Sequence, residues 1–160
     1  MDKDLLIEPI SKGNFYDFLL LIDKLAEYEK LIPPNRQARK RLREDGLSKN
    51  TKYEAYVGKI RGTYVGYFIF FMTYSSLLAK PTLYLEDIFV LEEYRKIGIG
   101  QNFLNFIVSI AKERGCGRVE WHVLRWNKPG IAFYEKNNAQ HLSDWLFYRL
   151  TSDQFDAFLK

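Results

Sequence analysis

Apolar residues recur along the chain at two spacings, one typical of helices and the other typical of strands. Apolar positions three or four residues apart predict a helix capped by Asn14 and ended by Pro33, and another helix over 101–114. Runs rich in aromatic and β-branched residues predict strands at 5–10, 53–59, 65–74, 82–90, 118–124 and 145–150. Shorter helices are expected at 36–46 and 128–137, and Thr151 can cap a terminal one. This order predicts a mixed α/β sheet with helices on both faces.

Composition narrows the class of protein. The chain has 160 residues, of which 47% are hydrophobic and 16% aromatic, so one domain with a good core is expected. Nothing approaches the roughly 20 apolar residues of a membrane-spanning helix, and the charged N-terminus lacks the apolar centre of a signal peptide. The single cysteine, Cys116, excludes an internal disulfide framework. A cytoplasmic protein with no membrane partner is therefore expected.

A glycine-rich loop follows the strand at 82–90. It has the pattern Arg95-x-x-Gly98-x-Gly100 and leads directly into a helix. Glycine leaves backbone amides unshielded, and the helix start adds partial positive charge, so this loop suits a phosphate or pyrophosphate. Neither the Gly-Lys-Ser/Thr ending of a P-loop nor the third glycine of a dinucleotide fingerprint is present. A tight turn without a ligand is the alternative.

Several segments together resemble the GCN5-related N-acetyltransferase (GNAT) superfamily. The glycine loop matches its acetyl-CoA-binding motif, and Asn127 and Tyr134 match the next motif. The stretches LAEYEKL at 25–31, YLEDIFV at 84–90 and EYRKIGIG at 93–100 resemble the diamine acetyltransferase branch, which includes spermidine/spermine and thialysine N-acetyltransferases. The similarity runs from Ile7 to about Leu150.

This resemblance implies one GNAT domain over residues 1–160. Its fold would be a central, mixed, mostly antiparallel twisted sheet of about six to seven strands with helices on both faces. The implied reaction transfers acetyl from acetyl-CoA to a primary amine of a small polyamine or lysine-like substrate, by direct attack in a ternary complex. A homodimer is also implied by the resemblance.

Amine acetylation needs a general base, a general acid and residues that bind both substrates. An alkyl amine arrives as an ammonium, so a carboxylate must attract it and take its proton. The resemblance assigns Glu86 as the base, near Asp87, and Tyr134 as the acid. Neighbouring strand residues point to opposite faces, so Glu86 and Asp87 can serve one ligand only where the strand is bulged or splayed. The alternatives are an ion pair for one carboxylate and a core or rim position for Tyr134.

The resemblance also assigns the binding residues. The cofactor contacts are Phe89, Val90, Arg95, Lys96, Ile97, Gly98, Ile99, Gly100, Asn127 and Tyr134, and the amine contacts are Tyr28, Glu29, Glu86 and Asp87. Asn127 can also cap the following helix, and Glu29 can be a solvated helix end. His122 and His141 have no ligand cluster around them, so no metal is expected.

One departure bears on the substrate. Polyamine enzymes of the branch carry an acidic residue and a tryptophan after the third strand, where this chain has Ser75, Ser76 and Leu77. The loss of one recognition charge favours a shorter amine. The alternatives are acetylation of a protein lysine or N-terminus, and a non-catalytic acyl-CoA-binding regulatory protein. Nucleic-acid binding has only the basic run at 36–43 in its favour and is not expected.

Overall fold

The computed structural model describes residues 4–159, which fall into two units. Within the described residues the first unit runs to His122 and the second begins at Val123, and each is described by itself. The expectation of one GNAT domain over the whole chain stays a prediction.

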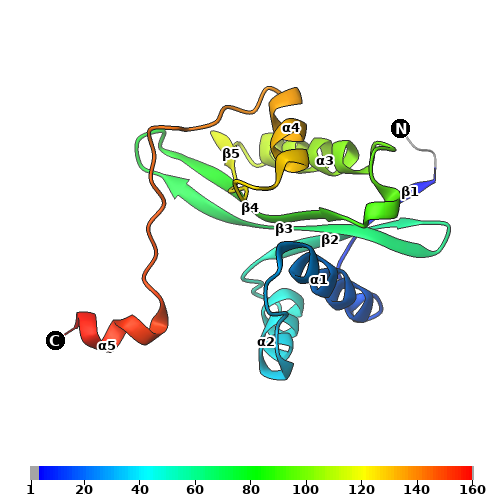
Figure 1. Ribbon diagram of the computed structural model, residues 1–160, viewed down its shortest axis with the longest axis horizontal. Helices are drawn as coiled ribbons and strands as arrows, with labels where there is room; N and C mark the ends of the chain where they lie inside the picture. The colour runs from blue at the N-terminus through cyan, green and yellow to red at the C-terminus, as the bar shows by residue number, and fades with distance from the viewer. Residues whose placement is uncertain (1–3, 160) are drawn as a thin grey trace. The chain divides into compact units, whose positions relative to one another are not determined.

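The first unit is built around one five-stranded sheet (Figure 1). Its strands are β1 (Leu5–Pro9), β2 (Glu54–Ile60), β3 (Thr63–Ser75), β4 (Lys80–Val90) and β5 (Arg118–Glu120). They lie in chain order, with antiparallel pairing from β1 to β4 and parallel pairing between β4 and β5. The expected mixed, mostly antiparallel sheet is therefore confirmed, with five strands in place of six to seven.

Helices cover both faces of this sheet, as the sequence predicted. Figure 1 shows α1 (Phe15–Glu29) and α2 (Arg36–Leu47) on one side and α3 (Ile99–Glu113) on the other. A short 3-10 helix, η1 (Glu92–Tyr94), connects β4 to the glycine loop. The two faces have separate hydrophobic clusters, which we call the α1-side and the α3-side cluster.

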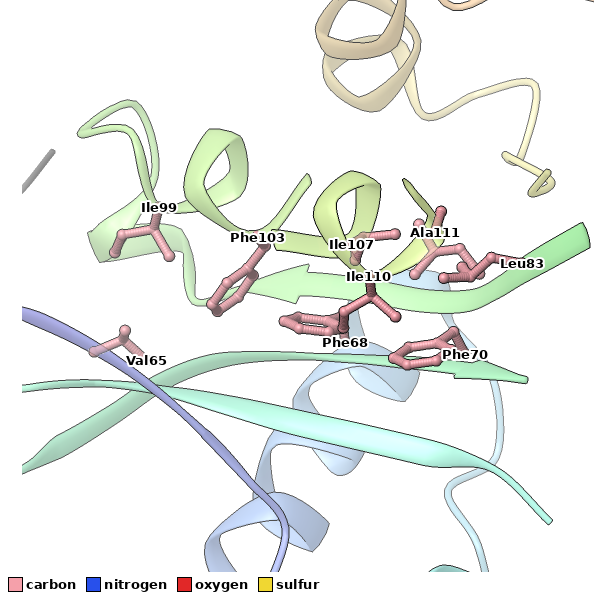
Figure 2. Close-up of a cluster of buried hydrophobic side chains, with 10 residues drawn as sticks. Val65, Phe68, Phe70, Leu83, Ile99, Phe103, Ile107, Ile110 and Ala111 are labelled. Atoms are coloured by element: carbon pink, nitrogen blue, oxygen red, sulfur yellow. The ribbon is translucent and has the colours of Figure 1, made fainter. Parts of the chain in front are cut away.

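The α3-side cluster shows why α3 is amphipathic. Phe103 and Ile107 of α3 are fully buried and point at the sheet, where they pack in one cluster with Phe68 and Leu83 (Figure 2). Each such side chain contributes roughly 1.5–3 kcal/mol through burial. On the opposite face, the helical spacing of Phe15, Phe18 and Leu21 directs α1 onto the α1-side cluster. This packing fixes the ends of β4, α1 and α3, where the predicted site residues lie.

Two strand expectations differ from the structure, for physical reasons. The apolar, aromatic-rich segment 145–150 forms no strand in the described structure, because such a run makes a strand only where another strand supplies hydrogen-bond partners. The strand expected at 118–124 pairs only over Arg118–Glu120, opposite Thr82–Tyr84 of β4. Its pairing ends just before an irregularity in β4 at Glu86.

The second unit contains α4 (Lys128–Lys136), the 3-10 helix η2 (Ser152–Gln154) and the short α5 (Phe155–Phe158). Thr151 caps η2 in a reciprocal capping box with Gln154, as expected from its position. Across residues 4–159 no helix is both long and apolar enough to cross a membrane.

Candidate active site

Strand β4 carries a β-bulge at Glu86. In the register with β3, Leu85 lies opposite Phe70 and Asp87 lies opposite Ile69, so Glu86 is an extra residue without a partner position. A bulge of this kind breaks the strict alternation of side chains between the two faces of a sheet. Two adjacent carboxylates of a strand can serve one ligand only at such an irregularity. The register of β4 with β3 contains one.

Core packing shows on which face each side chain of β4 lies. Before the bulge, Leu83 and Leu85 belong to the α3-side cluster, which places the intervening and following residues on the α1 side. After the bulge, Ile88 packs on the α3 side and Phe89 on the α1 side. Because the bulge shifts the alternation by one residue, the side chains of Glu86 and Asp87 both lie on the α1 side of the sheet.

Asp87 is held on that side by a buried tyrosine. The hydroxyl of Tyr67, a member of the α1-side cluster, donates a hydrogen bond of 3.2 Å to Oδ2 of Asp87. Burial, followed by the charge of Asp87, raises the pKa of Tyr67 well above its ordinary value, so the phenol keeps its proton as a donor. Sequence reasoning did not single out Tyr67, which is one of several aromatic residues in β3.

Three carboxylates share this part of the protein. Burial, then the charge of Glu86, raises the pKa of Asp87 to about 6, although the hydrogen bond from Tyr67 opposes the shift and Glu29 adds to it. Burial also raises the pKa of Glu29. Glu86 itself is exposed. The arrangement concentrates negative charge beside the end of α1, and such a site is suited to an ammonium ligand.

The C-terminal end of α1 brings Tyr28 and Glu29 toward β4. The helix ends at Glu29, and Lys30 follows in the left-handed conformation with φ 57°. Arg95, which comes just after η1, places its guanidinium carbon 4.6 Å from the centre of the Tyr28 ring. The structure thus gathers four predicted amine contacts, Tyr28, Glu29, Glu86 and Asp87, within the first unit.

The glycine loop has the conformation expected of an anion site. Lys96 has φ 65° and Gly98 has φ 96°, both in the left-handed region. Gly98 is the N-cap of α3, and no side chain of the described residues caps that helix. The first amides of a helix have no carbonyl partner within it, so an external anion can accept their hydrogen bonds.

We expect Gly98→Ala to lower both stability and cofactor affinity. A Cβ atom at this position would meet nothing within 4 Å, so the cost is backbone strain alone, on the order of 1–2 kcal/mol. The measurements are urea unfolding and the affinity for acetyl-CoA, the cofactor that the motif resemblance implies. Gly13→Ala is the matched control, because Gly13 has no positive φ and its added Cβ would touch only Ser11 Oγ at 3.7 Å. Equal stability of the two variants would contradict the strain argument.

Asn127 and Tyr134 lie in the second unit. Asn127 comes just before α4, and Tyr134 lies on it. Asn127 is the N-cap of α4, and its Oδ1 accepts a hydrogen bond of 3.1 Å from the Gly130 amide. The capping alternative is therefore confirmed for Asn127. Tyr134 lies on α4 beside Phe133, with ring centres 5.4 Å apart. Their roles toward the cofactor stay predictions.

Two arginines of the basic run at 36–43 make structural contacts. In α2, Arg39 pairs with Asp23 at 2.6 Å and Arg43 lies over the Phe15 ring, so part of the basic run serves packing against α1. Among residues 4–159 no group of three or more His, Cys, Asp or Glu side chains is arranged to hold a metal ion.

The fold and the carboxylate-lined end of β4 define an acyltransferase of the GNAT type. The chain belongs to the acetyltransferase (GNAT) family, whose model matches residues 21–139. It is 31% identical over 159 residues to a thialysine N-epsilon-acetyltransferase of Bos taurus, with 92% of this chain and 93% of the relative covered. It is 45% identical over 92 residues to an L-ornithine N5-acetyltransferase of Arabidopsis thaliana, which covers 58% of this chain and only 40% of that protein.

A solved structure has the same fold. An aminoglycoside N-acetyltransferase in complex with CoA aligns with a TM-score of 0.75 at 17% identity, covering 91% of this chain and 94% of that one. The curated relatives match the diamine acetyltransferase branch that the motifs resemble. The protein is an acyltransferase, and its homologues support action on an amine.

Proposed function

We propose that this protein transfers an acetyl group from acetyl-CoA to a primary amine of a small diamine or lysine-like compound such as thialysine. The observation that carries the proposal is the bulge at Glu86, which directs two adjacent carboxylates to the face where α1 ends in Glu29. Two separated sites of negative charge suit a substrate that carries one ammonium to be acetylated and a second ammonium to be recognised.

The residues present fit coenzyme A as the acetyl donor. The amides from Arg95 to Gly100 would hold its pyrophosphate, because Gly98 and Lys96 adopt the left-handed angles that turn successive amides into one concavity. The strand end at Phe89 and Val90 would hold the pantetheine arm and the thioester carbonyl, and Asn127 would add a side-chain contact. Family membership and the CoA-bound neighbour support this assignment.

The chemistry then follows from the protonation states. The ammonium of the substrate loses a proton to Glu86, directly or through a water molecule, and the neutral amine attacks the thioester carbonyl. The new C–N bond would form and the C–S bond would break, and the phenol of Tyr134, the acid that the resemblance assigns, would give its proton to the departing thiolate, whose basicity is similar. The second proton, which the attacking nitrogen loses as it becomes an amide, would restore the Tyr134 phenol through solvent. Asp87 and Glu29 hold the substrate through its positive charge. The reaction occurs directly in a ternary complex of enzyme, acetyl-CoA and amine.

The turn after β3 favours a short substrate. Ser75 is buried, and its Oγ accepts a hydrogen bond of 3.2 Å from the Leu78 amide, so this side chain serves the geometry of the turn. Neither Ser76 nor Leu77 carries charge. A long polyamine would find no additional carboxylate in this turn, whereas a compound with two amines needs none.

An amine panel tests the proposal. Acetyl-CoA is offered with thialysine, lysine, putrescine, spermidine or a lysine peptide, and thiol release is measured. We expect thialysine or another short two-amine compound to give the highest kcat/KM and the peptide to give little or none. Turnover of the peptide with inert small amines would overturn the substrate class in favour of protein acetylation. CoA binding without turnover of any amine would favour a regulatory protein.

Two further expectations come from the resemblance alone. A homodimer and a cytoplasmic location stay predictions, since the described single chain bears on neither.

A further inference from the structure

The resemblance assigns Arg95 to the cofactor, and in the structure its side chain contacts residues of α1 and β4. Its Nε donates a hydrogen bond of 2.9 Å to the Val90 carbonyl, which fixes the start of the side chain against the end of β4. Its guanidinium carbon lies 4.6 Å from the centre of the Tyr28 ring and 5.7 Å from that of Phe89. Arg95 is therefore held among three groups that belong to α1 and β4.

These contacts place a positive charge beside Tyr28, in the last turn of α1. That turn holds no basic residue itself, Lys30 follows it as the C-cap, and the carbonyl end of a helix attracts cations. A guanidinium over an aromatic face is attracted to the ring as well. The Phe89 ring belongs to the α1-side cluster and lies 6.1 Å from that of Tyr67, the residue that holds Asp87. Arg95 thus contacts Tyr28, which precedes Glu29 in α1, and Phe89, whose ring neighbours Tyr67.

We propose that the Arg95 side chain is a positioning residue for the amine, and that only its main chain serves the cofactor. It fixes the Tyr28–Glu29 end of α1 against the end of β4, and so sets the distance between Glu29 and the Glu86–Asp87 pair. Because Arg95 also begins the glycine loop, ordering of that loop by the cofactor and formation of the amine site are linked. This inference rests on the proposed function, since it concerns how the same site receives its amine.

We expect Arg95→Gln to raise the KM for thialysine much more than the KM for acetyl-CoA. The KM for thialysine should rise about tenfold, which corresponds to the loss of a well-placed cation–ring contact and its hydrogen bond. The KM for acetyl-CoA should change less than about twofold, because backbone amides remain. Arg95→Lys, which keeps the charge, should restore part of the loss. Lys112→Gln, an exposed cation in the last turn of α3, is the control and should leave both KM values unchanged.

A double-mutant cycle separates positioning from a general loss of structure. Tyr28→Leu removes the ring and keeps Arg95, and the combined Arg95→Gln/Tyr28→Leu variant should bind thialysine no more weakly than the poorer single variant. Putrescine serves as a second probe, and calorimetry with CoA present measures affinity independently of turnover.

The outcomes distinguish this inference from the function on which it rests. A larger rise in the KM for acetyl-CoA than for thialysine would make the Arg95 side chain a cofactor ligand and overturn the proposal. Additive effects in the cycle would overturn it as well. Wild-type protein that neither binds nor acetylates the two amines would overturn the proposed function and this inference together, whereas normal wild-type turnover with either result above overturns the inference alone.

Discussion

Glu86→Gln is expected to lower kcat/KM for the amine by about 100-fold or more near neutral pH, the range in which a positioned general base contributes. Glutamine keeps the shape of the side chain but cannot take a proton. Glu86 is the unpaired residue of the β4 bulge and is exposed, so the substitution disturbs neither the strand register nor the core. The loss should therefore be catalytic, with the melting temperature unchanged.

The pH dependence of this loss identifies the role of Glu86. An alkyl amine has a pKa near 10.4, so the fraction that needs no base grows as the pH rises toward that value. The variant should be most impaired at pH 6–7 and should approach the wild type near pH 10. Glu113→Gln, at the exposed end of α3, is the matched control and should be silent at every pH. A constant factor across pH would indicate that Glu86 only attracts the ammonium, and full activity would remove it from the site.

Sequence patterns predicted the parts of the fold that local chemistry determines. The helical spacing after Asn14 and after Gly100 gave α1 and α3 to within a few residues, because amphipathic periodicity reports burial on one face. The adjacent carboxylates of β4 even indicated where a strand irregularity was needed. The segment 145–150 has the apolar and aromatic composition of a strand but pairs with none in the described structure, and its sequence contains no information about a partner.

The candidate site likewise contains residues that the local sequence predicts and contacts that it does not predict. Glu86 and Asp87 could be singled out because charge inside an apolar strand is costly without a purpose. The hydrogen bond from Tyr67 to Asp87 and the stacking of Arg95 on Tyr28 join residues far apart in the chain. Neither contact leaves a periodic or compositional trace, so both required three-dimensional coordinates.

Asp87→Asn is expected to impair the enzyme and to stabilise the fold. The variant removes a charge that attracts the ammonium, so kcat/KM for thialysine should fall by about ten- to 100-fold, mostly through KM. Asparagine keeps an oxygen that can accept the hydrogen bond from Tyr67. The local structure should therefore survive, and the loss should reflect charge.

The stability effect has a definite sign. The pKa of Asp87 is about 6 in the native protein, mainly because of burial and Glu86, and near 3.9 in an unfolded chain. Between these values the native state holds a proton that the unfolded state has lost, so stability falls as the pH rises from about 4 to about 6 and stays lower above that range. Asp87→Asn should therefore raise the free energy of unfolding by about 3 kcal/mol at pH 8 and make little difference at pH 4.

Urea unfolding at the two pH values, together with the KM for thialysine, measures both effects. Asp144→Asn, at an exposed position of the second unit, is the control and should change neither. In the wild type the KM for thialysine should also climb steeply as the pH falls below about 6, where Asp87 becomes neutral, and the variant should lack that rise. A destabilised variant at pH 8 would mean that the charge of Asp87 is compensated within the protein. Asp87 would then be a structural residue, because a carboxylate kept for binding an ammonium remains a cost to the fold until that ligand arrives.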